Sequence, residues 1–411
     1  MMISLVEAAP PIDVLMPRLV ALQLADLKIA TVTPTLIDEV WRVSAVQRVG
    51  VVSISGHEVR ISPKLPIERL FFMMGYANGR RIWRNEDAQL DSDTDVLATV
   101  ARVFIRRMRK AIAQGLLQGY VSVHESQSVV RGRIDFDEQL KRRPGIPSPM
   151  AVAYDEFTVD IQENRMLAAA VGRLLRLPQI DADSRRLLKR YEMVFQGVSL
   201  LQPGTPVGNV HFDRRNEQYR PAYELAALIV SGSSLEHRFG TTSASGFLMN
   251  VADVYEDFLG AAIKEALERT NGGTVILQLP GHLDAASRLR IKPDIAWSTN
   301  GNVAAIVDAK YKAQKPAGYP NADVYQMLAY CSRYGLREGH LVYAAGEEDP
   351  AIHSILGSGI KVHCHALNLD CSPPALLDRV NALAARIAEG ARAGSGPGSL
   401  SAVVRQPIAT I

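Results

Sequence analysis

The chain has 411 residues, of which 47% are hydrophobic and 22% are charged, so it is long enough for two or three domains with ordinary hydrophobic cores. Its formal net charge is only +3, so binding of nucleic acid requires local basic patches. No apolar run approaches the roughly 20 residues that a membrane-spanning helix needs, which excludes a membrane protein.

The first residues and the cysteines favour a protein of the reducing cytoplasm. The start, Met1 to Glu7, has an early acid and no basic flank, so it lacks the pattern of a secretory signal. Cys331, Cys364 and Cys371 are too few and too scattered for a disulfide framework, a four-cysteine metal site or an iron–sulfur cluster. We therefore expect a cytoplasmic protein.

Residues 1–90 are predicted to form a β-rich N-terminal domain. Short apolar runs alternate with Gly56 and several prolines, which is typical of strands separated by turns. The predicted strands are residues 19–24, 28–32, 40–43 and 47–54. The acidic and polar segment 87–95 is predicted to be a linker to the next region.

Residues 91–235 are predicted to be a mixed, mainly helical region, and the docking of a partner is assigned to it only by the family resemblance given below. The predicted helices, marked by apolar residues at helical spacing, are residues 94–117, 161–177, 181–196 and 221–230. The predicted strands are residues 120–123 and 128–134, which precede a proline-rich break at 143–149.

Two basic stretches of this region are candidate contacts. Arginines interleave with apolar residues along the first predicted helix, and a second basic stretch follows the predicted strands. The candidate contact residues are Arg102, Arg106, Arg109, Arg131 and Arg133. These side chains can meet DNA phosphates, a partner protein or only solvent, and the sequence leaves the three alternatives open.

Residues 236–390 are predicted to form a C-terminal α/β domain, followed by a flexible tail rich in glycine and serine at 391–411. Apolar residues at helical spacing from Phe247 to Leu267 predict a helix. This helix carries Glu256 beside its apolar stripe, so we expect an acid close to the core of the domain.

Two predicted strands of this domain carry its most informative residues. The strands, 289–297 and 305–312, are separated by an Asn-Gly pair that is typical of a tight hairpin turn. A hairpin of this length brings Asp294 close to Asp308. Because side chains alternate along a strand, Asp308 and Lys310 lie on one face.

Two carboxylates and a lysine at one sheet edge suit Mg²⁺-dependent cleavage of phosphodiester bonds, because hard carboxylate oxygens hold Mg²⁺ while the ion keeps waters and binds phosphate. In this interpretation Asp294 and Asp308 bind the metal, with Glu256 as a third carboxylate. Lys310 positions the attacking water or offsets charge in the transition state, and Gln326 on the next predicted helix orients water or touches DNA. The simpler interpretation is an exposed ion pair with solvated neighbours.

These residues resemble the PD-(D/E)XK nuclease core in its restriction-endonuclease-like form. The matching segments are the helix with Glu256, Pro293-Asp294, Asp308-Ala309-Lys310 and the helix with Tyr325-Gln326-Met327-Leu328-Ala329-Tyr330. Asp-Ala-Lys-Tyr-Lys followed by Tyr-Gln-x-x-Ala-Tyr is similar in particular to McrC, the nuclease subunit of McrBC-type modification-dependent restriction systems. Two patches, residues 130–136 and 154–167, also resemble that family, so the resemblance runs from about Arg131 to about Tyr343.

The resemblance implies a DNA endonuclease that uses one or two Mg²⁺ ions together with a McrB-like AAA+ GTPase hexamer, which it stimulates. The implied substrate is double-stranded DNA with methylated cytosine. The sequence has no Gly-x-x-x-x-Gly-Lys-Ser/Thr loop, so nucleotide hydrolysis comes from the partner. The helix with Arg102 is the expected partner contact, and Lys312 is a further candidate contact with DNA or partner. The targeted sequence context, the stoichiometry and activity without the partner stay open.

Two other functions are compatible with these residues. One is a stand-alone PD-(D/E)XK nuclease of repair or junction cutting, and the other is a non-catalytic adaptor of an AAA+ motor. The intact set Asp294, Asp308 and Lys310 argues against the adaptor, because a scaffold does not need like charges held close together. The histidines, including His363 and His365, lack the spacing of a zinc site, so structural roles are expected for them.

Overall fold

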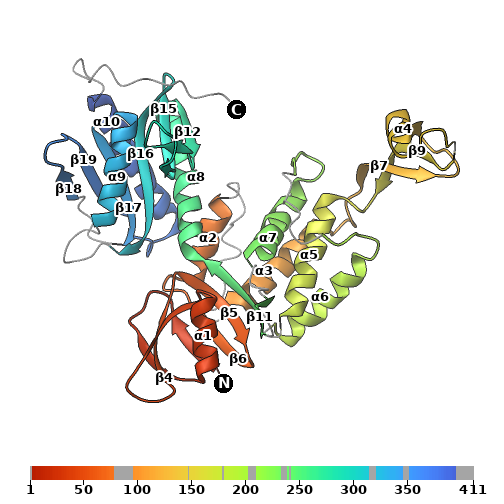
Figure 1. The fold of residues 1–411 in the computed structure, drawn as a ribbon, viewed down its shortest axis with the longest axis horizontal. Helices are drawn as coiled ribbons and strands as arrows, with labels where there is room; N and C mark the ends of the chain where they lie inside the picture. Colours follow the sequence, from red (N-terminus) through yellow and green to blue (C-terminus); the bar gives the residue numbers. More distant parts are fainter. Residues whose placement is uncertain are drawn as a thin grey trace.

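The computed structural model describes residues 2–77, 96–146, 148–177, 180–201, 210–232, 238–239, 242–313, 321–345 and 351–394. The molecule is elongated, with a β-rich N-terminal part, a C-terminal α/β domain beside it and a helical region on the other side (Figure 1). A narrow arm projects from the helical region, away from the C-terminal domain. The several sheets and helices confirm the predicted α+β multidomain class.

The N-terminal part is built on two sheets. The five-stranded sheet has the order β1 (Met2–Val6), β6 (His57–Ser62), β5 (Arg48–Ile54), β11 (Thr242–Asn250) and β10 (Arg238–Phe239). The three-stranded sheet has the order β2 (Ile12–Leu15), β4 (Val40–Ala45) and β3 (Ala30–Pro34). The helices of this part are α1 (Arg18–Asp26) and α2 (Ile67–Ala77). Strands β3, β4 and β5 confirm three of the four predicted strands.

The strand predicted at 19–24 is wrong, because this segment lies in helix α1. Val20, Ala21 and Leu24 are buried, whereas Leu22 is exposed. This spacing places the buried side chains on one face of a helix and would split them between the two faces of a strand.

Strand β11 returns from the second half of the sequence to the N-terminal sheet, where it pairs antiparallel with β5. The prediction that this segment belongs to the C-terminal domain, with a helix from Phe247, is therefore wrong. Phe247 and Leu248 are only 0% and 5% exposed and pack into different core clusters. A strand buried on both faces shows no polar alternation, so its sequence resembles a helical apolar stripe. Helix α8 (Val251–Asn271) begins after Asn250, whose side chain accepts a hydrogen bond from the Ala252 amide at 3.1 Å.

The helical region contains the helices that the sequence predicts. They are α3 (Val96–Ala111), α5 (Gln162–Arg176), α6 (Ala182–Val194) and α7 (Arg220–Gly232), with the 3-10 helix η2 (Glu217–Tyr219) before α7. Helix α5 packs between α6 and α7, and α3 contacts both of these neighbours. Asp181 caps α6, because its carboxylate accepts a hydrogen bond from the Ser184 amide at 2.9 Å.

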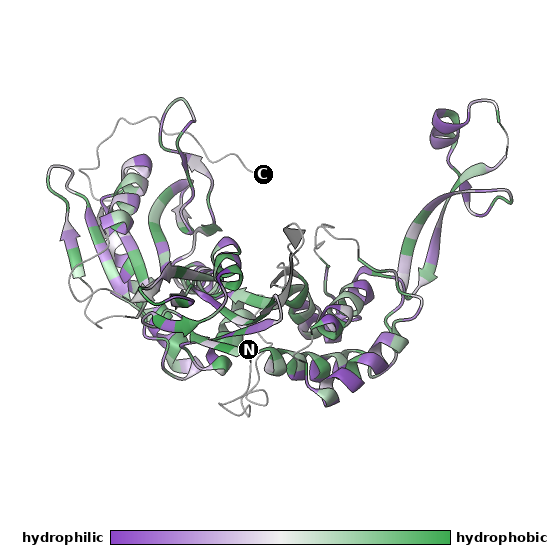
Figure 2. Ribbon diagram, turned by 60° about the horizontal axis from the view of Figure 1, so that its bottom comes forward, coloured by the Kyte–Doolittle hydropathy of each residue, from purple (hydrophilic) through white to green (hydrophobic). Residues whose placement is uncertain are grey.

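The arm consists of β7 (Gly119–Gln127), β8 (Arg133–Ile134), α4 (Phe136–Arg142) and β9 (Met150–Thr158). The strands predicted at 120–123 and 128–134 both pair with β9 rather than with each other. Hydrophobic segments (green) and hydrophilic segments (purple) alternate along the arm (Figure 2). The Tyr120 and Phe157 rings pack in a tilted arrangement with centroids 5.1 Å apart, yet both side chains are exposed.

Gly132 lies where the chain of the arm crosses its own strand β9. Its φ is +79°, and a Cβ there would lie 2.5 Å from the Tyr154 Cβ. Only glycine tolerates both the close approach and this backbone conformation. The glycine of Arg131-Gly132-Arg133 is therefore required by the local geometry of the arm.

The C-terminal domain has a six-stranded sheet. Its order is β12 (Thr274–Leu277), β15 (Ile295–Thr299), β16 (Asn302–Ala313), β17 (Glu338–Ala345), β19 (Lys361–Ala366) and β18 (Ala351–Ser354). A two-stranded ribbon joins β13 (Gly281–His282) and β14 (Arg290–Ile291). Strands β16, β17 and β19 run parallel, and α9 (Asn321–Tyr334) connects β16 to β17. The predicted hairpin between β15 and β16 is confirmed, with positive φ at both Asn300 and Gly301.

Helices cover both faces of this sheet. Helix α9 covers the face with Leu341 and Tyr343, which we call the α9 face, and α8 and α10 (Pro373–Gly394) cover the opposite face with His340 and Val342, the α10 face. Helix α10 extends to Gly394, so the beginning of the tail predicted at 391 is helical. The predicted linker 87–95, residues 314–320 and the tail from 395 lie outside the described residues. No helix among the described residues has both the length and the apolar character needed to cross a membrane.

The N-terminal part contacts strand β16 directly. Glu7 is 0% exposed, and the Tyr311 hydroxyl donates a hydrogen bond to its carboxylate at 3.3 Å. The side-chain amide of Gln47 donates to the backbone carbonyl of the same tyrosine. Burial raises the pKa of Glu7, partly opposed by hydrogen bonds from Lys64 and Tyr311. Two residues of the N-terminal part thus hold β16 immediately after Lys310.

Candidate active site

The β15–β16 hairpin brings Asp294 and Asp308 together. Ile295 of β15 pairs with Val307 of β16. Asp294, the residue before β15, therefore lies level with Asp308, the next residue of β16. The Ala309 amide donates a hydrogen bond to the Asp294 carboxylate at 2.9 Å, which fixes this carboxylate against β16. Asp308 is only 1% exposed. The sequence prediction that these acids are neighbours agrees with the structure.

Lys310 lies beside Asp308 on the same face of β16. Its ammonium contacts the Asp308 carboxylate, and the side chain of the lysine is 16% exposed. The same ammonium donates a hydrogen bond to the Gln326 side chain at 2.9 Å. Gln326 in turn donates to the Tyr330 hydroxyl at 2.7 Å. Helix α9 therefore holds the lysine through two polar side chains spaced one turn apart.

Glu256 reaches this group from α8 through a residue that the sequence reasoning missed. The Gln278 side-chain amide donates one hydrogen bond to the Glu256 carboxylate and another to the Asp294 carboxylate at 3.1 Å. Gln278 follows β12 and has a φ of +52°. Its signal in the sequence is a lone polar side chain between Leu277 and Leu279.

The three carboxylates repel one another in a poorly solvated place. Burial raises the pKa of Asp308 to about 6, with a further increase from the Asp294 charge and an opposing effect of Lys310. Burial also raises the pKa of Asp294, opposed by the Ala309 amide and increased by Glu256. Burial, then the Asp257 charge, raises the pKa of Glu256. A cation that binds here relieves this repulsion.

The donor set fits Mg²⁺, because it consists of hard carboxylate oxygens. Asp294 is the middle member, linked to Glu256 by Gln278 and adjacent to Asp308. The three carboxylates do not all converge within 4.8 Å. Among the described residues, the possible metal ligands that lie within 4.8 Å of one another in a group of three are histidines. Asp294 therefore lies between the other two carboxylates, beside Asp308 and joined to Glu256 through Gln278.

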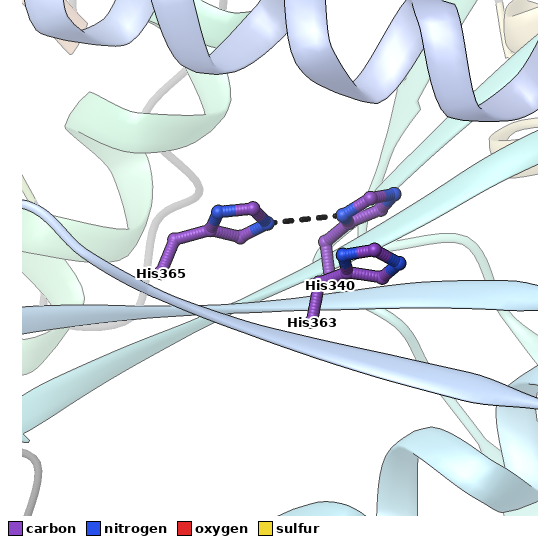
Figure 3. Close-up of side chains that lie close together, drawn as sticks. All are labelled: His340, His363 and His365. Carbon is purple, nitrogen blue, oxygen red and sulfur yellow. Dashed lines mark hydrogen bonds between the residues drawn. The ribbon is translucent and has the colours of Figure 1, made fainter. Parts of the chain in front are cut away.

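The histidines correct one expectation. The sequence showed no zinc-spaced cluster, but the parallel pairing of β17 with β19 places His340 beside His363, and His365 lies nearby (Figure 3). The interval between His340 and His363 in the sequence is set by a crossover and carries no local motif, so sequence spacing could not reveal the group.

The candidate contact residues lie elsewhere. Arg102 and Arg109 are exposed on α3, and Arg102 lies 4.0 Å from the Asp181 carboxylate. Arg131 and Arg133 are exposed on the arm. The remaining candidates are Arg106, half-buried on α3, and Lys312, whose side chain lies outside the described residues. The structure therefore separates these residues between the helical region, the arm and β16.

The sequence and the fold were then compared with known proteins. Residues 43–344 match the family described as McrBC 5-methylcytosine restriction system component. One similar solved structure is a half-complex from a tetradecameric assembly of Thermococcus gammatolerans McrB AAA+ hexamers with bound McrC. It has a TM-score of 0.58 and 18% identity over 94% of this chain and 99% of that chain. Another is the Thermococcus gammatolerans McrBC complex, with a TM-score of 0.41 and 22% identity over 65% of this chain and 88% of that chain. No curated protein matches the chain.

Proposed function

Because the chain belongs to the McrBC 5-methylcytosine restriction system component family, we propose that it is the endonuclease subunit of a modification-dependent restriction system. In this proposal the C-terminal domain is a PD-(D/E)XK nuclease that cuts double-stranded DNA carrying methylated cytosine. The observation that supports it most is the group of Asp294, Asp308 and Lys310 at one end of a buried hairpin. Burying these charged groups costs desolvation free energy, and a purely structural hairpin does not require charged groups at this place.

Asp294 and Asp308 would hold Mg²⁺ through their carboxylate oxygens. Glu256 supports Asp294 through the Gln278 amide, which keeps the two carboxylates aligned. Mg²⁺ bound there supplies positive charge to the phosphate and activates water. The raised pKa of Asp308, about 6, still leaves its carboxylate ionised at neutral pH.

Lys310 supplies the second positive charge. Its ammonium is oriented by Asp308 on one side and by the Gln326 carbonyl oxygen on the other. From this position it donates a hydrogen bond to the scissile phosphate or to the attacking water as negative charge develops. Tyr330 fixes Gln326 and is itself anchored, because its hydroxyl donates to the Lys292 carbonyl at 3.3 Å. The four groups form one preorganised chain.

The partner in this proposal is a McrB-like AAA+ GTPase hexamer. A chain with no nucleotide-binding loop in its sequence needs such a motor for GTP hydrolysis. Arg107 of α3 is only 8% exposed and donates to the Pro221 carbonyl at 3.3 Å, so part of this basic helix faces its neighbours. The arm offers a better docking surface, because large apolar side chains are exposed on it. They are Tyr120, Phe136, Leu140, Ile146 and Phe157.

Plasmid cleavage tests the proposed function. Methylated and unmethylated plasmid are incubated with Mg²⁺, with and without the McrB-like partner and GTP. We expect cleavage of methylated DNA only when all components are present. Asp308→Asn should lower the cleavage rate on the order of 10²–10³-fold, while GTP hydrolysis by the partner continues. The matched control is Asp378→Asn on the exposed side of α10, which should cleave normally.

Two outcomes contradict the proposal. Cleavage without partner and nucleotide would indicate a stand-alone nuclease. Stimulated GTP hydrolysis with no cleavage from any combination would indicate an adaptor without catalytic activity.

A further inference from the structure

Three histidines gather on the α10 face of the C-terminal sheet, opposite the face of the candidate active site. Asp308 pairs in register with Leu341, and Lys310 with Tyr343, so the carboxylate and the lysine share the α9 face with these residues. His340 precedes Leu341 and therefore points to the other side. The histidine group is thus separated from the candidate active site by the thickness of the sheet.

The three imidazoles can reach a common ion. One nitrogen of each ring lies within 4.8 Å of the corresponding nitrogens of the other two. The His340 Nδ1 and the His365 Nε2 are 3.1 Å apart (Figure 3). Nitrogen ligands of a tetrahedral zinc ion, each about 2.1 Å from it, are separated by about 3.4 Å. The spacing observed between these two rings is therefore close to the one that a metal site requires.

Burial prepares the imidazoles for binding metal. His340 and His365 are 3% and 5% exposed, and the side chain of His363 is 17% exposed. Burial lowers the pKa of His340 well below its usual range and that of His365 to about 3. Burial also lowers the pKa of His363. Neutral imidazole is the form that coordinates metal, so the three rings need not lose protons at neutral pH.

A carboxylate accompanies the group. Glu338 lies at its more open side, 3.5 Å from the His363 Nε2. A carboxylate beside an imidazole is a frequent companion of metal ligands.

Positive charge near the group is limited to exposed side chains. Arg386 of α10 lowers the pKa of His365, and Lys361 lowers that of His363. Both cations are solvent-exposed, so water screens their repulsion of a bound ion. Glu338 is 26% exposed and offsets them from within the group.

We propose that His340, His363 and His365 form a transition-metal site for an ion of the Zn²⁺ class, with the Glu338 carboxylate beside the His363 Nε2. Imidazole suits Zn²⁺, Ni²⁺, Cu²⁺ and Fe²⁺, whereas Mg²⁺ prefers oxygen. The ion ties β17 to β19 beneath α10 and is structural. The site is independent of the Mg²⁺ site of the proposed nuclease.

Zinc analysis of the full chain tests this site. The protein is prepared without a histidine tag, stripped with a chelator, and then given ZnCl₂ in the presence of excess Mg²⁺ before desalting. We expect about one zinc per chain by mass spectrometry and a higher melting temperature than that of the stripped protein. Retention of less than about a tenth of an ion per chain by the wild type would overturn the proposal.

Matched variants locate the ion. His363→Asn and His365→Asn should each retain at least about tenfold less zinc than the wild type. His211→Asn, which changes an exposed histidine of the helical region, should retain the full amount. Asp308→Asn should also retain it, which separates this site from the candidate active site. Equal zinc in the His363→Asn, His365→Asn and control proteins would overturn the assignment.

X-ray absorption on the zinc-loaded wild type keeps the test decisive if the histidine variants do not fold. A first shell of nitrogen and oxygen with the multiple scattering of three imidazoles supports the site. Sulfur ligands, or a spectrum without imidazole scattering, would overturn it.

Discussion

The two faces of the C-terminal sheet bury titratable groups with opposite results. On the α9 face Asp308 is 1% exposed and stays paired with Lys310. On the α10 face His340 is 3% exposed and touches other imidazoles. Burial favours the neutral form of both kinds of group, raising the pKa of the acid and lowering that of the base. On the α9 face the compensating charge is the ammonium of Lys310 in direct contact with Asp308, whereas on the α10 face Glu338 lies 3.5 Å from the outermost imidazole, that of His363.

The type of donor atom that each face presents decides which class of ion it suits. Carboxylates that remain ionised against a lysine present hard, charged oxygens, the donors that Mg²⁺ selects. Imidazoles that burial keeps neutral present nitrogen donors, which suit borderline transition metals. Neighbouring strands of one sheet thus present two kinds of donor set because their side chains alternate.

The largest effect is expected when Lys310 is replaced, because only the α9 face should respond. Lys310→Met leaves Asp308 buried without its cation and removes the donor next to the scissile phosphate, so we expect the cleavage rate to fall about 10²-fold. Zinc content should not change. Lys361→Met, an exposed lysine of β19 in the same sheet, is the matched control and should cleave normally. Cleavage by Lys310→Met at the wild-type rate would remove the lysine from the mechanism.

Gln278 tests whether the carboxylates act as one set. Gln278→Leu removes the amide that joins Glu256 to Asp294, so these two acids repel each other and align less well. We expect the Mg²⁺ concentration for half-maximal cleavage to rise about tenfold. A titration of cleavage with Mg²⁺ measures this, with the exposed Gln196→Leu as control. An unchanged Mg²⁺ dependence would mean that Glu256 does not support the metal ligands.

The smallest effect is on stability, and it has opposite signs on the two faces. Folding raises the pKa of Asp308 from 3.8 to about 6, so the Mg²⁺-free chain gains stability from this group as the pH falls through 6 and reaches the full gain near 4. Asp308→Asn should therefore raise the melting temperature at pH 8 by about 2–5 °C and have little effect at pH 4. Scanning calorimetry with a chelator measures this.

His365 gives the reverse dependence. Its pKa falls from 6.5 to about 3 on folding, so its contribution to stability is present above pH 6.5 and is lost as the pH falls from 6.5 towards 3. His365→Asn should lose less stability on acidification than the wild type. The same sign of pH dependence for Asp308→Asn and His365→Asn would contradict the electrostatic contrast between the faces.

The part of the candidate site that the sequence could predict is the part encoded by local pattern. Asp308 and Lys310 share a face because strands alternate, and the Asn300-Gly301 turn fixes how far the hairpin extends. Gln326 lies beside Lys310 because α9 connects directly from β16 to β17. In each case one element or one short connection determines the contact.

The parts that could not be predicted depend on pairing between distant segments. His340 meets His363 only through the register of two parallel strands, and Gln278 reaches Glu256 only because β12 pairs with β15. Strand β11 joins the N-terminal sheet across 202 positions of the sequence, as the pair Asn250 and Arg48 shows. A continuous apolar run such as that around Phe247 does not reveal whether it is buried by a helix or by a sheet.

The hold of the N-terminal part on Tyr311 has a mechanical consequence. Glu7 accepts a hydrogen bond from the hydroxyl of this tyrosine, and Gln47 donates one to its backbone carbonyl. Tyr311 follows Lys310 directly in the sequence. The same N-terminal sheet also contains β11, the strand that leads without a loop into α8, which carries Glu256. A rotation of that sheet would therefore shift Lys310 through the contacts with Tyr311 and Glu256 through the junction of β11 with α8. A partner that rotates the N-terminal part could thus change the spacing between the lysine and the carboxylates.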